Sequence, residues 1–294
     1  MGSLRERSSL DRLFGSTQHE PGHRNRPKCA TVLTAVLLAI GAVFMFPISD
    51  DNPTRRTSYV TYGLIGLNVV VFLRQLQLDS QQVVSRSGAV LGSALDYFLR
   101  DWAVVPVQLT AAIAGSRIPH LPGVLSEPPE FLTLVTSQFL HGGWMHLIGN
   151  MLFLWIFGNN VEDQLGRVKF LGFYLTCGVL AALTQWVFSP ESMIPCLGAS
   201  GAIAGVMGAY ILRFPKVSIN TYIPPFFILP IPAFAYLGIW FLQQAMSSVS
   251  RPMGGQGGVA YWAHAGGFVF GAVLGVLLGV LKQDDFDDDL RAKR

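Results

Sequence analysis

Long apolar runs separated by short polar segments dominate the chain. A helix that spans a bilayer needs about 20 apolar residues, because the hydrocarbon core is about 30 Å thick. Six runs approach or reach this length. The fourth run is short and rich in glycine, and hydropathy alone leaves open whether it spans or lies buried. The six predicted spans are Tyr59–Leu76, Trp144–Val161, Val168–Phe188, Ala199–Leu212, Ile223–Met246 and Val259–Leu281.

A seventh apolar run, Cys29–Phe46, carries no charge and ends just before Pro47. Residues 1–28 contain six Lys and Arg side chains and are expected to form a disordered basic tail. Basic segments prefer the cytoplasmic side of a membrane. If the chain enters the first span at Tyr59 from the cytoplasm and the seventh run also spans, the basic tail lies outside, which is its less favoured side. Otherwise the run is an interfacial helix or a targeting segment that is removed. We favour a membrane-associated helix and leave spanning open.

The composition agrees with a membrane protein. Charged residues make up 13% of the chain, hydrophobic residues 51%, and the mean hydropathy is +0.42, whereas a soluble domain carries about 25% charged residues. We therefore expect an all-α polytopic membrane protein surrounded by the lipid bilayer. The net charge of +3 is spread over termini and loops, so no nucleic-acid partner is expected. Three cysteines without C-x-x-C spacing indicate no disulfide framework and no zinc knuckle: Cys29, Cys177 and Cys196.

Basic residues in the short loops predict the orientation of the spans. If the chain enters the first span from the cytoplasm, three basic pairs and the C-terminal tail lie inside. The outer basic residues fall mostly in one long loop, where this rule is weak. The loops therefore favour a membrane domain at 58–282 with both ends cytoplasmic, followed by an acidic and basic tail at 283–294. The pairs are Arg55 and Arg56, Arg167 and Lys169, and Arg213 and Lys216.

The long loop, near residues 77–140, is not uniform. Leu91–Leu109 mixes apolar and charged residues, as a helix lying in the membrane interface would. Pro128 and Pro129 interrupt any helix there, and Phe131–Leu140 is apolar. We expect part of this loop to dip into the membrane against the helices.

Polar side chains at the start of the second span form the first candidate site. In a helix, His146 and Asn150 are four residues apart and share one face, and His141 lies in the preceding loop. Polar groups at membrane depth are costly and indicate function by default. The alternative is that they satisfy backbone groups at the helix entry, which explains His141 equally well.

The second candidate site is Gly198-Ala-Ser200-Gly201, at the start of the fourth run. A serine among small residues is often only a packing residue, and Gly201, Gly205 and Gly208 form a ridge for close helix packing. The motif also differs from the G-x-S-x-G elbow of soluble hydrolases. Ser200 nevertheless begins a helix, where free N–H groups and the helix dipole favour a developing negative charge. Ser200 is therefore a candidate nucleophile, supported by Gly198 and Gly201.

The third candidate site is His264, in the sixth run. If the glycine stripe that follows it packs against the ridge after Ser200, His264 can reach Ser200. The alternative is a histidine bonded to a backbone carbonyl. No Asp or Glu lies within the six runs, so a Ser–His–Asp triad is not available in the membrane, but a Ser–His dyad is. The stripe consists of Gly267, Gly271, Gly275 and Gly279.

These blocks, in this order and on separate helices, resemble the rhomboid family of intramembrane serine proteases over about Tyr59–Leu281. Any one block is weak, but the ordered set is specific. The set is H-x4-H-x3-N at His141, His146 and Asn150, G-x-S-G around Ser200, A-H-x-x-G around His264, and E-x3-G-R from Glu162.

The resemblance implies a six-helix bundle, with or without one extra N-terminal helix, and an active site in a water-filled cavity below the outer surface. It implies Ser200 as nucleophile and His264 as general base. His146, Asn150 and the Ser200 N–H group would form the oxyanion hole, with His141 supporting. The long loop would lie sideways in the membrane, and residues 247–258 would form a movable cap.

Two positions depart from the family pattern. Leu132-Thr133 stands where many members carry Trp-Arg, which affects how the long loop is anchored. Ala204 stands where some members carry an aromatic residue that stacks on the base. Another side chain must therefore hold His264, and Trp262 and Tyr261 are the nearby candidates.

The predicted function is that of a serine endopeptidase that cleaves single-span membrane proteins near the outer membrane face. No cofactor is expected, and no metal, because H-E-x-x-H is missing and three histidines would have to converge without a carboxylate. The alternatives are a catalytically inactive rhomboid-like protein that binds transmembrane helices, and a polytopic transporter. A bacterial inner membrane is the simplest location. The sequence leaves the substrate, the cleavage site and the oligomeric state open.

Overall fold

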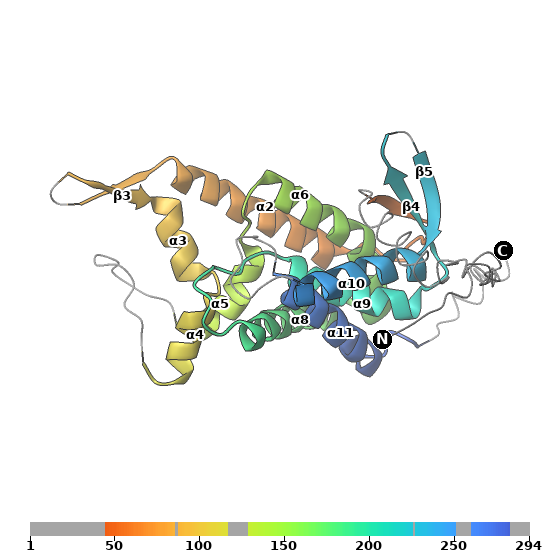
Figure 1. Cartoon of the computed structure of the whole chain (residues 1–294). Helices are drawn as coiled ribbons and strands as arrows, with labels where there is room; N and C mark the ends of the chain where they lie inside the picture. The colour runs from red at the N-terminus through yellow and green to blue at the C-terminus, as the bar shows by residue number, and fades with distance from the viewer. Residues whose placement is uncertain (1–44, 86–87, 117–128, 226, 251–259, 283–294) are drawn as a thin grey trace, which may run out of the picture. The chain divides into compact units, whose positions relative to one another are not determined.

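The described chain consists mainly of α-helices, with two small β-sheets (Figure 1). The computed structural model describes residues 45–85, 88–116, 129–225, 227–250 and 260–282, all within the unit Val43–Arg294. The helices are α2 (Tyr59–Asp79), α3 (Ala94–Trp102), α4 (Pro106–Ile113), α5 (Glu130–Thr136), the 3₁₀ turn η1 (Ser137–Phe139), α6 (Trp144–Phe153), the π-helical segment η2 (Leu154–Gly158), α7 (Asn159–Leu165), α8 (Arg167–Phe188), α9 (Ser200–Arg213), α10 (Ala233–Ser250) and α11 (Tyr261–Leu277). The strands are β1 (Phe46–Asp50), β2 (Gln82–Val84), β3 (Val90–Ser93), β4 (Ser218–Ile223) and β5 (Phe227–Pro232).

Most of the predicted spans are helices in the structure. The first, third, fourth and sixth runs form α2, α8, α9 and α11, and the second run forms the consecutive helical segments α6, η2 and α7. Within the described ranges, α2 and α8 are long and apolar enough to cross a bilayer by length and composition, and α11 is apolar but has 17 residues. Several predicted segments lie outside the described residues: the tail 1–28, residues 29–44 of the seventh run, 251–258 of the cap, and the tail 283–294.

The fifth apolar run begins as a β-hairpin rather than as a helix. β4 lies between β1 and β5 in an antiparallel sheet, and α10 starts only at Ala233. The predicted start of the span at Ile223 is therefore wrong, and the all-α prediction misses these strands. The reason is the four prolines within residues 224–232, because proline inside a helix removes a hydrogen bond and clashes with the preceding turn. β5 tolerates its prolines because it is an edge strand.

The long loop folds into short helices instead of one interfacial helix. Leu91–Leu109 contains most of β3, all of α3 and the start of α4. The Ser93 hydroxyl accepts a hydrogen bond from the Asp96 N–H group at 3.2 Å, and the Asp96 carboxylate accepts one from the Ser93 N–H group at 3.0 Å, which is a capping box. The Thr136 hydroxyl donates to the Trp102 carbonyl at 2.8 Å. This contact joins α5 to α3. It anchors the long loop in a chain that carries Leu132-Thr133 where many rhomboids carry Trp-Arg.

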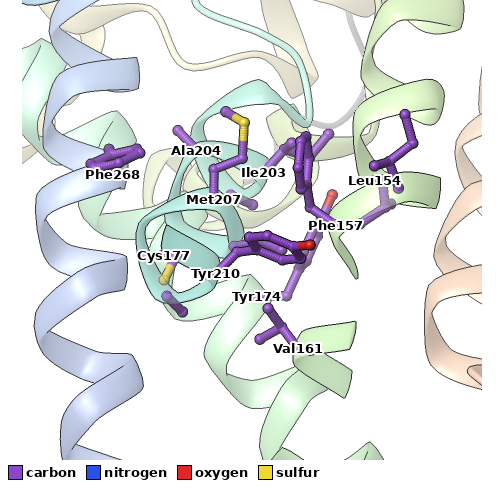
Figure 2. Packing of buried hydrophobic residues seen from close by; sticks show 14 of the residues in the cluster. Leu154, Phe157, Val161, Tyr174, Cys177, Ile203, Ala204, Met207, Tyr210 and Phe268 are labelled. Atoms are coloured by element: carbon purple, nitrogen blue, oxygen red, sulfur yellow. The ribbon is translucent and has the colours of Figure 1, made fainter. Parts of the chain in front are cut away.

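Helix α9 lies at the centre of the hydrophobic core. Ten of its 14 residues are buried, as expected for a helix that is apolar on all sides. In Figure 2, Ile203, Met207 and Tyr210 of α9 lie among side chains from η2, α7, α8 and α11. The rings of Tyr210 and Phe157 meet edge to face, with centroids 5.0 Å apart. Neighbours on several sides therefore fix the position of α9, which begins at Ser200.

Glycines allow α9 and α11 to touch backbone to backbone. A Cβ atom on Gly267 would overlap the carbonyl oxygen of Gly201, and a Cβ atom on Gly271 would overlap the backbone of Gly205. A side chain at either position would push the helices apart. The predicted packing of the two glycine stripes is confirmed for these pairs. Gly279 instead lies beyond the end of α11, with a φ of 93°.

A buried carboxylate fixes the start of α2. Glu162 Oε1 accepts the Val60 N–H group at 3.0 Å, and Oε2 accepts the N–H group and the hydroxyl of Thr61 at 2.7 and 2.8 Å. A negative charge is favourable at a helix N-terminus, where N–H groups lack partners within the helix. Beside this contact, Arg55 Nε donates to Asp163 Oδ2 at 2.9 Å. The E-x3-G-R block therefore joins the end of the second span to the first.

Replacing Gly271 with alanine should lower the free energy of unfolding by about 1–3 kcal/mol, the usual cost of overpacking a tight contact. The physical reason is the overlap of the new methyl group with the Gly205 backbone. Gly172→Ala in α8 is the control, because a Cβ atom there meets nothing within 4 Å and alanine is the better helix former. Thermal unfolding in detergent measures both variants, and equal midpoints would contradict the role of the α9–α11 contact.

Candidate active site

Ser200 is the first residue of the central helix, and a well-anchored loop leads into it. Gly198 has a φ of 123°, a conformation that residues with a side chain rarely adopt. Its N–H group donates to the Ser137 carbonyl at 2.9 Å, and Cys196 forms a β-bridge with Val104. The long loop thus holds the turn before Ser200. The first N–H groups of a helix have no partner within the helix, and no side chain caps them in α9.

His264 meets Ser200 across the close contact of α9 with α11. Its Nε2 atom lies 2.7 Å from Ser200 Oγ. The distance suits a hydrogen bond in which the hydroxyl donates and the ring nitrogen accepts. Both side chains are partly buried, and the glycine pairs Gly201–Gly267 and Gly205–Gly271 set the helix spacing behind them. The structure therefore brings together the two residues that the sequence singled out.

Helix α10 supplies the side chains that hold the His264 ring. The Trp240 ring lies 5.9 Å from the His264 ring, measured between centroids, and Gln244 Oε1 lies 2.8 Å from His264 Nδ1. Trp262 stacks on Phe188 instead, at 3.8 Å and 7°, so the suggestion that Trp262 holds the base is wrong. Gln244 is a site residue that the sequence motifs do not predict. An amide within an apolar run was the available signal, because polar groups at membrane depth need a partner.

His146 and Asn150 lie on one face of α6 and point toward the loop before Ser200. A Cβ atom on Gly198 would lie 2.8 Å from His146 Nε2 and 3.6 Å from Asn150 Nδ2, so only glycine fits between them. The Gly142 N–H group donates to His146 Nδ1 at 3.3 Å. In a neutral ring this places the proton on Nε2, the atom that faces Gly198.

The Asn150 amide is one of several buried polar groups without a hydrogen-bond partner in the described part of the chain. Asn150 is 8% exposed, and its Nδ2 atom has no hydrogen-bond partner among the residues that the structure describes. Buried polar groups nearly always have a partner, so an unpaired one indicates strain or function. With His146 Nε2 it lies beside Gly198, two residues before Ser200.

His141 is also buried, 2% exposed. The Gln75 side chain holds its backbone with two hydrogen bonds: the His141 N–H group donates to Gln75 Oε1 at 3.0 Å, and Gln75 Nε2 donates to the His141 carbonyl at 2.9 Å. Its ring meets the His146 ring edge to face at 5.2 Å. Burial, followed by the nearby His146, lowers the pKa of His141 to about 4. His141 is therefore neutral at neutral pH and packs against His146.

The match to a protein family decides the identity of the fold. Residues 128–280 match the family model described as the rhomboid domain. This range contains His141, His146, Asn150, Ser200, Gln244 and His264. This chain belongs to the rhomboid family. It is therefore an integral membrane protein with a helical polytopic fold.

Rhomboid relatives occur in organelles and in bacteria. The chain is 30% identical over 148 residues to Rhomboid protein 1, mitochondrial, of Saccharomyces cerevisiae. This match covers 49% of this chain and 41% of the relative. It is 31% identical over 172 residues to Rhomboid-like protein 11, chloroplastic, of Arabidopsis thaliana, covering 55% and 58%. It is 44% identical over 80 residues to the rhomboid protease GluP of Bacillus subtilis, covering 27% and 15%. The matches thus span less than two thirds of each relative.

The predicted bacterial inner membrane is not supported. The yeast and Arabidopsis relatives carry mitochondrial and chloroplastic names, and their matches cover more of this chain than the match to GluP does. A removable targeting segment in the N-terminal apolar run stays a prediction, because residues 1–44 lie outside the described ranges.

Proposed function

We propose that this rhomboid protein is an intramembrane serine endopeptidase that cleaves single-span membrane proteins near the outer membrane face. The observation that carries the proposal is the 2.7 Å distance between Ser200 Oγ and His264 Nε2. Acyl transfer requires a nucleophile and a base within hydrogen-bond reach, beside donors for the oxyanion. The similarity to a bacterial rhomboid protease supports the same activity.

In the proposed reaction, Ser200 Oγ attacks the scissile carbonyl carbon while His264 Nε2 takes the hydroxyl proton. The tetrahedral intermediate collapses when His264 returns this proton to the leaving amine, which breaks the peptide bond. Water then attacks the acyl-enzyme while His264 Nε2 takes its proton. His264 gives that proton to Ser200 Oγ as the acyl bond breaks and the new carboxyl terminus leaves. A dyad suffices for these steps, because one imidazole carries the proton in both directions.

The proposed oxyanion hole consists of His146 Nε2–H, Asn150 Nδ2–H and the Ser200 N–H group. Each preorganised donor is worth about 3–4 kcal/mol in the transition state. His141 supports the His146 ring by its edge contact. Gly198 and Gly201 are supporting residues because they leave room for the His146 ring and for the Ala181 side chain of α8.

The proposed protease domain is residues 58–282, with six spans formed by α2, by α6 to α7, and by α8, α9, α10 and α11. Both ends of the domain face the same side, as the basic short loops favour. The long loop lies sideways against the outer half of the helices. A substrate helix enters between the second and fifth spans and unwinds locally, because a stable helix hides its amides.

A catalytically inactive rhomboid-like protein that binds transmembrane helices is the alternative with the same fold, and a transporter is a more distant one. Neither needs a serine hydroxyl in contact with an imidazole. The pairing of Ser200 with His264, beside the unpaired Asn150 donor, favours the enzyme.

Reaction with a fluorophosphonate probe tests the nucleophile. Wild-type protein in detergent should be labelled, and Ser200→Ala should abolish both labelling and cleavage of a model transmembrane substrate. His264→Ala should lower cleavage at least about 100-fold, since a general base contributes 10²–10⁴. Ser80→Ala, at an exposed serine after α2, should leave both intact. Wild-type protein that never labels, or labelling that survives Ser200→Ala, would contradict the proposal.

Removal of the Asn150 amide tests the oxyanion hole. Asn150→Ala should lower kcat by 10²–10³-fold with little change in KM, because the donor acts on charge that develops only in the transition state. Thermal unfolding should change little, because no protein hydrogen bond of Nδ2 is lost. Met145→Ala, at an exposed position of the same helix, is the matched control. A variant that raises KM alone would assign Asn150 to substrate binding instead.

We infer that the protein resides in an organellar membrane, mitochondrial or plastid, because matches covering 49% and 55% of the chain carry such names. A fluorescent fusion should co-localise with a marker of one of these organelles in a host cell. Fluorescence confined to the plasma membrane would contradict this location.

A further inference from the structure

Gln244 lies on the face of α10 that carries Trp240 one turn before it and Ser248 one turn after it. α10 contains no Asp, Glu, Lys or Arg, so no charged side chain of this helix lies near Gln244. Trp240, one turn before Gln244, also contacts His264. Two successive turns of α10 therefore place side chains against the same imidazole. An amide in an apolar span is costly unless it is hydrogen-bonded, and this amide bonds to the proposed base.

The two ring nitrogens of His264 have different partners. Nε2 faces Ser200 Oγ at 2.7 Å, and Nδ1 faces Gln244 Oε1 at 2.8 Å. An amide oxygen can only accept a hydrogen bond, so Nδ1 must carry the proton of the neutral ring. The lone pair then lies on Nε2, where it can accept the Ser200 proton. The opposite tautomer would leave two acceptors facing each other at Nδ1 and no base facing the serine.

We infer that Gln244 is a positioning residue, which sets the tautomer and orientation of His264 as a carboxylate does in a soluble Ser–His–Asp triad. The inference rests on the proposed function. The amide performs this role without a buried negative charge, which is costly in a low-dielectric site. When His264 accepts the serine proton, Nδ1–H remains bonded to Oε1, so the ring keeps its orientation while it is charged.

The surroundings of His264 allow this role to be isolated. Among the described residues, His146 is the titratable side chain that interacts electrostatically with His264. The charged residues of the helices packed against α11 lie at their opposite ends: Arg167 and Lys169 at the start of α8, and Arg213 at the end of α9. A charge placed at position 244 should therefore act on His264 above all.

Two variants of Gln244 test the inference in the full chain, with Gln243→Met on the neighbouring face of α10 as the matched control. Gln244→Met keeps the length of the side chain but removes the acceptor, and should lower kcat about 100-fold with KM unchanged, the lower end of what a general base contributes. Gln244→Glu keeps an acceptor at the same position and should retain activity. Its carboxylate should move the acidic limb of the kcat/KM profile upward by about one pH unit or more, because an adjacent opposite charge favours the imidazolium.

The tautomer itself gives a readout that does not depend on activity. In protein labelled with ¹⁵N-histidine, the His264 signal, assigned by its loss in His264→Ala, should report a proton on Nδ1. Gln244→Met should produce a mixture of tautomers, and Gln243→Met should not. A wild-type proton on Nε2, or a Gln244→Met variant with unchanged kcat and an unchanged His264 signal, would overturn the inference. If wild-type protein shows no serine reactivity but the expected tautomer pattern, the proposed function fails and the positioning of His264 by Gln244 stands.

Discussion

The approach of α9 to α11 is the constraint on which the rest of the site depends. The side chains of Ser200 and His264 are short, so their helices must nearly touch for Oγ and Nε2 to meet at 2.7 Å. Only glycine permits this, because a Cβ atom on Gly267 or Gly271 would overlap the facing backbone. Lipid offers no hydrophobic force that drives helices together, so close packing must hold them. The same contacts that stabilise the bundle therefore set the geometry of the dyad.

The buried polar groups of this protein divide into two kinds. Glu162 and Gln75 are satisfied by backbone groups of neighbouring segments, and they fasten the start of α2 and the loop at His141. Asn150 Nδ2 has no partner in the described part of the chain. It lies near Gly198, two residues before the serine whose attack would place negative charge on the substrate carbonyl oxygen. Satisfied groups therefore support the site, and the unpaired Asn150 donor lies within it.

Much of this arrangement is predictable from the sequence, because its signals are local. Apolar length predicts α2 and α8, and the glycine spacing after Ser200 and His264 predicts which helices touch. The hairpin before α10 was missed because hydropathy counts proline-rich strands and helices alike, although Pro224 and Pro230 argue against a helix. Gln244 was missed for a different reason. Its partner is 20 residues away on another helix, and only the packing of α10 against α11 decides which side chain reaches Nδ1.

A neutral amide behind the base is consistent with the position of this site inside a bundle. A carboxylate at the same place would make His264 a stronger base, but the charge would have to be buried, and an unpaired buried ion costs several kcal/mol. The membrane makes that penalty hard to avoid, since water and counter-charges are scarce among the spans. An amide keeps the direction of the hydrogen bond and gives up only the charge. In the proposed protease, orientation by Gln244 and donors preset by His146 and Asn150 would carry the catalysis that a soluble triad shares with a carboxylate. The rate would then depend on how rigidly α6, α9, α10 and α11 hold these side chains.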